Sequence, residues 1–529
     1  MNIIDKTINY FSPQKGLERE IARVKTDILN SGYSGSGASH DKKSMKGWTD
    51  KSESPFKDID KNLPTLRSRS RQLFMNAPIA TSAIKTNRTN VVGQGLKLKS
   101  RIDFTRLGIT QEAADQWEKN TEREFNLWAK SRWCDATRLN NFFELQQIAL
   151  MSWLMNGDGW ALIKQQDITR FMPYSLNIYL IEADRISTPQ KDVNGNWLTL
   201  DNEIKKAANG NLIYNGVEIN SNGAVVAYWI CNSYPSDNNM IKKDWTRVEA
   251  FGKNTGNPNV LQLMESERCE QYRGVPYLAP VIESLKQISR YTEAELTAAV
   301  VTAFFTAFIK QEGSRNDNTW EQSIPQEQRV DDFDPNSYEL GAGTINILGP
   351  GEDVVIADAK RPASGFDPFV RSILKMIGAA LEIPFELLIK SFEASYSASR
   401  AALLEAWKSF RMRRTWFADD FCQPIYEIWL SEAVARGRIK APGYFNDPSI
   451  KNAWCGSEWI GPSPGQINPV QEVTASALKV ANGFSTRERE TMELTGGNFD
   501  DNVTQISREN KALGEASMLP TKEGENNNA

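Results

Sequence analysis

Histidine is almost absent from this chain of 529 residues, which contains only His40. A histidine-based catalytic triad and a metal site with paired histidines are therefore excluded, as is the usual general base near neutral pH. Cysteine is also scarce, and the five positions form no C-x-x-C pair and no zinc spacing. Such a scattered set indicates a reducing compartment and predicts buried structural thiols at Cys134, Cys231, Cys269, Cys422 and Cys455.

Phosphate-binding and catalytic motifs are missing as well. The sequence contains neither GxxxxGK[ST] nor GxGxxG, which argues against a P-loop motor. Residues 461–465 match G-x-S-x-G, but Pro464 has no N–H to offer an oxyanion, so we interpret them as a loop. Asp331, Asp332 and Asp334 lack the spacing of a calcium loop and are interpreted as an acidic solvated loop. We therefore predict no catalytic residue, no metal and no cofactor.

Long hydrophobic runs are lacking too. The longest one, Leu296 to Ile309, has 14 residues, fewer than the ~20 that a membrane span needs. The N-terminus shows no basic segment followed by an apolar run, so no signal peptide is predicted. The net charge of −4 and the pI of about 5.6 argue against a surface that is basic throughout.

The pattern of the first half predicts an α+β region. Apolar residues at helical spacing run from about Leu63 to Gly93 and from Thr110 to Trp128, and a third helix is expected over 142–155. Asn-Gly-Asp-Gly at 156–159 reads as a turn, and strand-like runs follow it. These runs are WALIKQQ, NIYLIEA, GVEIN and AVVAYWIC, whereas 232–260 is polar without clear pattern.

The second half predicts long helices separated by an acidic insertion. Val281 to Gln311 contains no Gly or Pro and reads as one helix of about 46 Å. Residues 313–363 carry ten acidic and four basic residues, a net charge of −6, with a hairpin expected around Gly349–Glu352. A helix is expected from Asp367 to Glu382, and a longer one from Ser399 to Arg436 with a kink at Pro424.

One basic segment departs from the acidic average, since residues 371–414 carry a net charge of +4. Its densest part is Arg411-Met-Arg-Arg414 on the long helix. Salt bridges to neighbouring side chains or solvation are the favoured interpretation, and a phosphate-facing patch is the alternative.

Several long segments in a fixed order resemble one known family. They include LRSRSRQLFMNAPIATSAIKTNRTNVVGQGLKL, RGVPYLAPVIESLKQISRYTEAELTAAVVTAFFTAFI and, most specifically, GAALEIPFELLIKSFEASYSASRAALLEAWKSFRMRR. INPVQEV and GFSTRERE fit as well. From Tyr33 to about Leu513 the chain resembles the portal proteins of lambda-type tailed bacteriophages.

The resemblance implies the portal fold, in which α+β chains assemble as a ring around a central channel. It implies a homo-oligomer, expected to be a dodecamer, at one vertex of the capsid. Double-stranded phage DNA would be packaged and ejected through it. The implied partners are the terminase large subunit, the major capsid and scaffold proteins, and a head-completion or tail adaptor. The implied location is the virion, and the host cytoplasm during assembly, with no membrane.

Mapped by order, the resemblance implies nine segments. They are a flexible N-terminal arm (1–60), a wing (61–278), a first stem helix (279–312), a clip (313–363), a second stem helix (364–383), a tunnel-loop region (384–398), a long kinked helix returning to the wing (399–455), a crown (456–513) and a disordered tail (514–529).

Three sets of site residues follow from this map. The tunnel loop, expected over Glu386–Ser397, would face DNA with Lys390, Ser391, Phe392, Glu393, Ser395 and Tyr396, although a buried turn is the alternative for this segment. The clip surface for the motor or adaptor would include Asp331, Asp332, Asp334 and Glu339. Subunits would pack in the stem through Leu296, Val300, Ala303, Phe304 and Phe308.

Two other classes of function stay open at this point. One is another ring-forming virion connector, although such chains are usually much smaller. The other is a carboxylate-dependent hydrolase, because 66 acidic residues allow a catalytic pair somewhere. Nothing in the sequence positions two such carboxylates, so we predict that the chain is not an enzyme.

Overall fold

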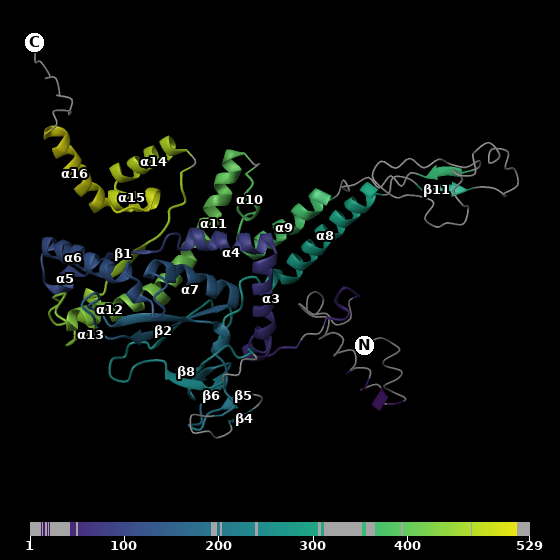
Figure 1. The fold of residues 1–529 in the computed structure, drawn as a ribbon, viewed down its shortest axis with the longest axis horizontal. Coiled ribbons are helices and arrows are strands. Elements are labelled where there is room, and N and C mark those ends of the chain that lie inside the picture. Colours follow the sequence, from purple (N-terminus) through teal and green to yellow (C-terminus); the bar gives the residue numbers. More distant parts are fainter. Residues whose placement is uncertain are drawn as a thin grey trace, which may run out of the picture. The chain divides into compact units, whose positions relative to one another are not determined.

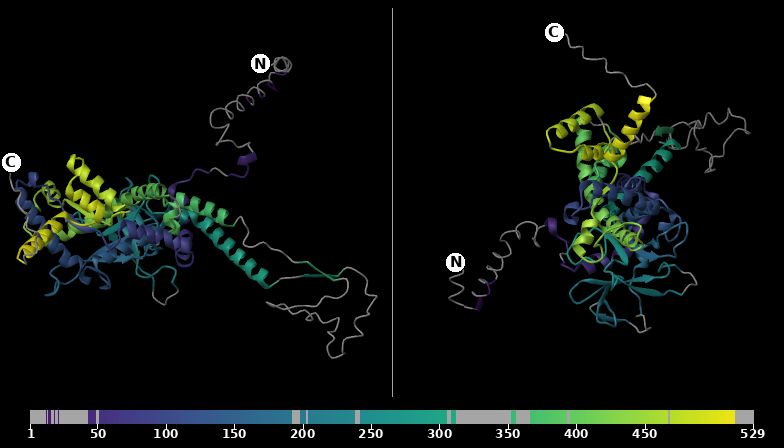
Figure 2. Two further views of the ribbon diagram at one scale, coloured as in Figure 1. Left: turned by 90° about the horizontal axis from the view of Figure 1, so that it is seen from above. Right: turned by 90° about the vertical axis from the view of Figure 1, so that its left-hand side faces the viewer.

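The computed structural model divides the chain into two compact units, 1–54 and 55–529. In the first unit the described residues include a 3-10 turn at Lys43–Met45 and an exposed Trp48. The second unit contains all the elements that follow (Figures 1 and 2). The structure describes residues 12, 14–15, 18, 21, 43–48, 51–191, 198–201, 204–237, 242–304, 308–311, 352–355, 366–392, 395–466 and 468–515.

The second unit begins with a π-helical turn, Phe56–Asp60, which the sequence assigned to the N-terminal arm. Ile59 and Asp60 are buried, and the ring of Phe56 lies edge-on to Tyr214 at 5.5 Å. The predicted end of the arm at residue 60 is therefore wrong. The apolar side chains of Phe56 and Ile59 pack against the fold.

Two helices, α3 (Leu63–Asn76) and α4 (Pro78–Val91), replace the single helix expected here. Ala77 between them has extended backbone angles, φ −109° and ψ 111°. Proline disfavours helical geometry in the residue before it and cannot donate its own N–H, so Pro78 ends one helix and starts the next.

The next long helices follow the predicted pattern. Between them and α4 lies the short helix α5 (Phe104–Leu107). Helix α6 (Gln111–Ala129) is capped by Thr110, whose hydroxyl accepts from the N–H of Ala113, and it buries the predicted Ala114, Phe125 and Trp128. Helix α7 (Phe142–Asn156) opens with a capping box formed by Asn141 and Glu144.

Two antiparallel sheets cover the β-rich region. One has the strand order β10 (Val260–Met264), β2 (Asp158–Gln165), β3 (Leu176–Ile181), and α7 packs against β2. The other is a six-stranded meander in sequence order: β4 (Thr199–Asp201), β5 (Ile204–Lys206), β6 (Leu212–Tyr214), β7 (Val217–Ile219), β8 (Val225–Cys231) and β9 (Trp245–Glu249).

The four predicted strands are confirmed in these sheets. Residues 232–260, in which the sequence shows no clear pattern, contain β9 and the first residue of β10. Strand β9 is only partly buried and includes Thr246 and Arg247, so it lacks the apolar run that marks a buried strand.

The long C-terminal helix is interrupted. Helix α11 (Tyr396–Phe417) passes through a π-helical turn, Ala418–Cys422, into α12 (Gln423–Ala435), so the kink begins before Pro424. Phe125, Phe142 and Trp429 bring α6, α7 and α12 together, with Phe125 edge-on to both other rings at 5.0–5.7 Å. The remaining elements of this end are α13 (Pro448–Trp454), β13 (Ser457–Ile460, paired with β1, Lys97–Ser100), α14 (Pro469–Ala481), α15 (Arg487–Thr495) and α16 (Phe499–Glu515).

The cysteine prediction is confirmed at four positions and wrong at one. Cys134, Cys231, Cys422 and Cys455 are buried free thiols, whereas Cys269 is exposed. Burial raises the pKa of the Cys455 thiol to about 11, which keeps it protonated near neutral pH.

A buried ion cluster lies where the sequence suggested a simple turn. Only Gly157, with φ +89°, makes the turn, and Asp158 enters β2 with no exposed surface. Its carboxylate accepts from Arg67 at 2.9 Å and from Arg273 at 2.6 Å, and both arginines are fully or nearly buried. Burial alone would raise the pKa of Asp158, but the two guanidinium groups hold it below its ordinary value.

We predict that Asp158→Asn lowers the free energy of unfolding by about 3–5 kcal/mol, because the buried Arg273 loses the carboxylate that it contacts and the buried Arg67 keeps only its ion pair with Asp184, at 3.3 Å. Urea denaturation of the full chain measures this. The control Asp167→Asn removes an exposed carboxylate and should change stability by less than about 0.5 kcal/mol. Equal effects of the two variants would contradict the role given to Asp158.

Candidate functional site

The candidate site is built around the antiparallel helix pair α8 (Ile282–Phe304) and α9 (Phe366–Ala380), which lie side by side (Figure 1). The ring of Tyr291 on α8 contacts Phe366 at 5.4 Å and Phe369 at 5.2 Å between centroids. The predicted positions of two helices at this place in the sequence are thus confirmed.

The first helix is shorter than expected. It ends at Phe304, and Phe308–Gln311 form strand β11, paired antiparallel with β12 (Glu352–Val355). The prediction of helix over 308–311 is therefore wrong, and Phe308 lies in a strand. Aromatic and β-branched residues such as Phe308 and Ile309 fit a strand well, which the absence of Gly and Pro did not reveal. The first strand of the hairpin expected around Gly349–Glu352 lies outside the described residues.

The helix pair leaves apolar side chains exposed, including Phe369, whose ring also contacts Tyr291. Leu296 and Val300 of α8 are 66% and 49% exposed, and Phe369 and Met376 of α9 are 50% and 64% exposed. The assignment of Leu296 and Val300 to contacts between subunits stays a prediction. Ala303 and Phe304 lie in α8 as expected, but their side chains lie outside the described part.

Glu382, whose backbone has a left-handed conformation, connects α9 to the following segment. Glu382 has φ 54°, and its carboxylate accepts from Arg413 at 2.9 Å and from the Ser409 hydroxyl at 2.8 Å. Arg413 is only 3% exposed and also donates to Asn87 of α4 at 3.0 Å. The guanidinium lies over the ring of Tyr277, 4.9 Å from its centroid. These contacts join the end of α9 to α11, to α4 and to the segment before α8.

The neighbouring arginines are also satisfied within the chain. Arg414 donates to the carbonyl oxygens of Val91, Asn90 and Pro462 at 2.8–2.9 Å, and Arg411 pairs with Glu493 at 3.8 Å. The interpretation of the basic cluster as contacts with neighbours is confirmed. The alternative of a phosphate-facing patch is wrong for Arg413 and Arg414, whose guanidinium groups point into the protein.

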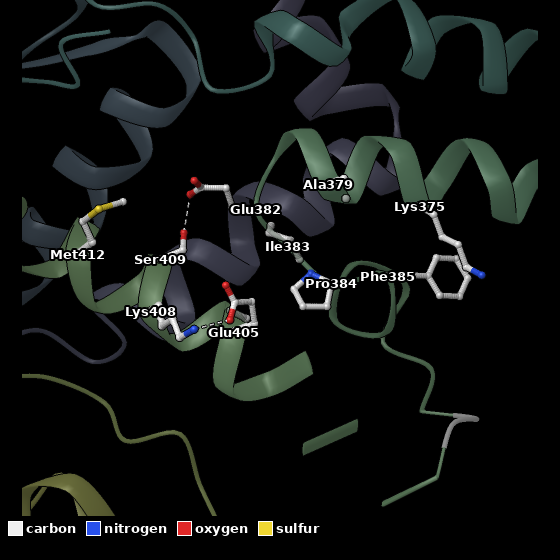
Figure 3. A pocket seen from close by; sticks show the side chains of 12 residues that line it. Lys375, Ala379, Glu382, Ile383, Pro384, Phe385, Glu405, Lys408, Ser409 and Met412 are labelled. Atoms are coloured by element: carbon white, nitrogen blue, oxygen red, sulfur yellow. Dashed lines mark hydrogen bonds and ion pairs between the residues drawn. The ribbon is translucent and has the colours of Figure 1, made fainter. Parts of the chain in front are cut away.

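A pocket of about 560 Å³ lies between α9 and α11 at this junction (Figure 3). Ile383, Pro384 and Met412 give it apolar walls, and the ion pair of Lys408 with Glu405 at 2.6 Å lies on its α11 side. Gly378 leaves no room for a side chain, because an added Cβ would lie 2.5 Å from the carbonyl oxygen of Ile383. The pocket is therefore the open side of a closely packed helix junction.

The predicted tunnel loop is partly helical. Helix α10 (Phe385–Ile389) occupies its first part, with Leu388 fully buried and its carbonyl accepting from Ser82 at 2.7 Å. Lys390 follows with φ 57°, and Phe392 is 52% exposed. The exposed side chain of Phe392 disagrees with the alternative of a buried turn at this residue. The first part of the segment is not an open loop, because it is helical and Leu388 is buried there.

The remaining loop residues are distributed as follows. Ser391 donates its backbone N–H to the carbonyl of Glu386 at 3.1 Å, and Ser395 caps α11 by accepting from Ala398 at 3.4 Å. Tyr396 is the first residue of α11. Glu393 lies outside the described residues, as do Asp331, Asp332, Asp334 and Glu339 of the expected clip surface.

The described ranges show neither a cluster of metal ligands nor a membrane-spanning helix. Among these residues no three His, Cys, Asp or Glu side chains are grouped as metal ligands would be. No helix in the described part of the chain is both long and apolar enough to cross a membrane.

The sequence profile described as "Phage portal protein, lambda family" matches residues 41–414 of the chain. The chain belongs to the lambda family of phage portal proteins. It is 25% identical over 510 residues to the portal protein of Escherichia phage N15, with 92% of each chain covered. It is 24% identical over 509 residues to portal protein B of Escherichia phage lambda, covering 92% of this chain and 91% of that protein. A chain from the neck of an empty GTA particle is 15% identical with a TM-score of 0.43, over 82% of this chain and 94% of that chain.

Membership of the family makes this chain a phage portal protein. The family is structural, and its members are part of the virion. The helix pair α8–α9 and residues 390–392, of which Lys390 and Phe392 are exposed, thus lie in a portal protein, at positions that the sequence assigned to the stem and to the tunnel loop.

Sequence reasoning did not find the junction at Glu382. Its carboxylate was counted only as one of the acids in a basic segment, and Arg413 only as part of a basic cluster. The two residues are 31 positions apart, so no local spacing links them. The one available signal was the stop of the helix just before Pro384.

We predict that Phe392→Ala changes the free energy of unfolding by less than about 1 kcal/mol, because its side chain is half exposed. Leu388→Ala, four residues earlier and fully buried, should cost about 2–5 kcal/mol. Thermal or urea melting of both variants tests this. A loss at Phe392 as large as that at Leu388 would show that Phe392 is core and would remove it from the loop surface.

Proposed function

We propose that this portal protein assembles into a homo-oligomeric ring, a dodecamer, at one vertex of the capsid. Double-stranded phage DNA would enter and leave through the central channel. The observation that carries the proposal is the helix pair α8–α9, whose exposed Leu296, Val300, Phe369 and Met376 form apolar faces that a monomer would leave in water. Side-by-side packing of copies buries such faces, and each fully buried large apolar side chain contributes roughly 1.5–3 kcal/mol.

The channel lining in this proposal includes Lys390, Ser391 and Phe392. A conduit for sliding DNA is best served by few strong phosphate contacts, because each one resists movement along the backbone. The inward orientation of Arg413 and Arg414 supports this, since it removes two of the positive charges of the basic cluster from the surface. Glu393, Ser395 and Tyr396 are proposed to complete the loop.

The acidic segment 313–363 is proposed as the clip that meets the terminase large subunit during packaging and a head-completion or tail adaptor afterwards. The major capsid and scaffold proteins would surround the ring, which assembles in the host cytoplasm. The chain is proposed to have no catalytic activity of its own, so that the packaging motor is a separate protein.

We predict that Leu296→Glu prevents ring assembly while the subunit stays folded. The side chain is 66% exposed, so the charge costs the monomer little, whereas burial between copies would cost several kcal/mol per subunit. Light scattering after size exclusion measures the assembly, and circular dichroism checks the fold.

The matched control is Ala294→Glu, which adds the same charge at an exposed position two residues away on a different side of α8. It should assemble as the unaltered chain does. Rings of normal size and stability from Leu296→Glu would overturn the proposed packing of the stem.

We also predict that reversing the clip charges, with Asp331→Lys, Asp332→Lys and Asp334→Lys together, weakens binding of the terminase large subunit while rings still form. The segment's net charge of −6 favours a basic docking surface on the partner, so binding should also weaken with added salt. Pull-down of the motor by purified rings at two salt concentrations measures both effects. Unchanged docking of the reversed variant would remove the acidic residues from the interface.

A further inference from the structure

Helix α14 has two contrasting faces. One face packs within the chain: Ser476 is buried, Glu472 pairs with Arg400 of α11, and Lys479 pairs with Glu490 of α15 at 3.5 Å. Glu472 and Lys479 are the only charged residues in α14, all of which the structure describes, and both are engaged in these pairs.

The opposite face of α14 is apolar and exposed. Val470, Val473 and Leu478 are 77%, 51% and 58% exposed, and Ala477 is exposed between them. The spacing of Val470, Val473 and Ala477 places them on one side of the helix. Phe484, just after the helix, is 80% exposed. An uncharged, apolar helix face open to water is a mark of an interaction surface.

Helix α16 presents a second, narrower apolar seam. Phe499, Val503, Ile506, Asn510 and Leu513 follow one another at intervals of four, three, four and three residues, which is the spacing of a coiled-coil seam. Val503, Ile506 and Leu513 are 48%, 52% and 40% exposed. Charged residues flank the seam, among them Asp501, Arg508 and Glu509. Figure 1 shows α16 leading away from α15, to whose end it is joined.

The two surfaces match in size. With 13 and 17 residues, α14 and α16 are about 20 Å and 25 Å long. A ring of identical copies requires two different complementary surfaces on each copy, because a surface that pairs with itself closes a dimer instead. The broad uncharged face of α14 and the narrow seam of α16 are two different surfaces, so pairing them with each other meets this requirement. Pairing either surface with the same surface of another copy does not.

We propose that the seam of α16 in one copy docks on the apolar face of α14 in the adjacent copy, around the ring. This inference rests on the proposed ring. It names a second interface, separate from the helix pair α8–α9, and assigns its partner as another copy of this chain. Asn510, the polar residue within the seam, would fix how far α16 slides along α14, as buried polar residues do in coiled coils.

Cysteine cross-linking in assembled rings of the full chain tests the docking. Cys269→Ser first removes the exposed natural thiol. Ile506→Cys is then combined in turn with Val470→Cys, Val473→Cys or Ala477→Cys, because the three positions sample successive turns along α14. Mild oxidation should convert most of the chain into a ladder of covalent multimers on a non-reducing gel in at least one combination.

The matched control is Ala512→Cys, an exposed residue on another side of α16, which should give no ladder with the same three partners. Light scattering before oxidation reports whether rings are present. Rings without a ladder overturn the α14–α16 interface and leave the proposed function intact. A chain that stays monomeric before oxidation overturns both.

Two further outcomes also count against the proposal. Ile506→Cys alone forming dimers would mean that α16 pairs with its own copy. A cross-link that leaves the chain monomeric would mean that the two helices meet within one subunit.

Discussion

The position of the helix pair α8–α9 relative to the sheets depends on one buried carboxylate. Asp158, at the start of β2, accepts hydrogen bonds from Arg67 of α3 and from Arg273, which lies shortly before α8. Arg273 also donates to the carbonyl oxygens of Ala183 and Ile186 at 2.9 and 2.8 Å. Arg273 donates as well to the carbonyl oxygen of Asn215, between β6 and β7. Helix α3, both of these sheets and the segment that leads into α8 thus share one electrostatic centre. Because its charges are out of water, the geometry tolerates little displacement.

Backbone packing reinforces this constraint. An added Cβ at Gly157 would lie 2.3 Å from the carbonyl oxygen of Gly274, and Gly157 has φ +89°. Both features require glycine, so the segment that carries Arg273 can lie directly against the turn that precedes Asp158. Just after α9, the hydrogen bond from Arg413 to Glu382 has the corresponding role for that helix. The start of α8 and the end of α9 are therefore held by buried arginines, while apolar side chains of the pair remain exposed.

The sequence predicted the helices and strands that local sequence patterns mark. Helices α6 and α7, the strands β2, β3, β7 and β8, and the helix pair were found because apolar periodicity and capping residues are local signals. Contacts between distant residues escaped this reasoning. Asp158 looked like a turn residue, and Arg413 like part of a charge cluster, because the partners that bury them are 91, 115 and 31 positions away. In the segment 386–397, the sequence predicted an exposed Phe392 but not the short helix α10, in which Leu388 is buried.

The uneven burial of the five thiols has a practical consequence for counting the subunits in an assembly. Four are enclosed in the fold, and burial raises the pKa of Cys422 and Cys455, so that neither forms a reactive thiolate readily. Cys269 alone among the five is open to alkylation. Each subunit therefore carries one natural attachment point for a fluorophore. In any assembly of intact subunits, the number of single-molecule bleaching steps at full labelling equals the number of copies, with no engineered residue required.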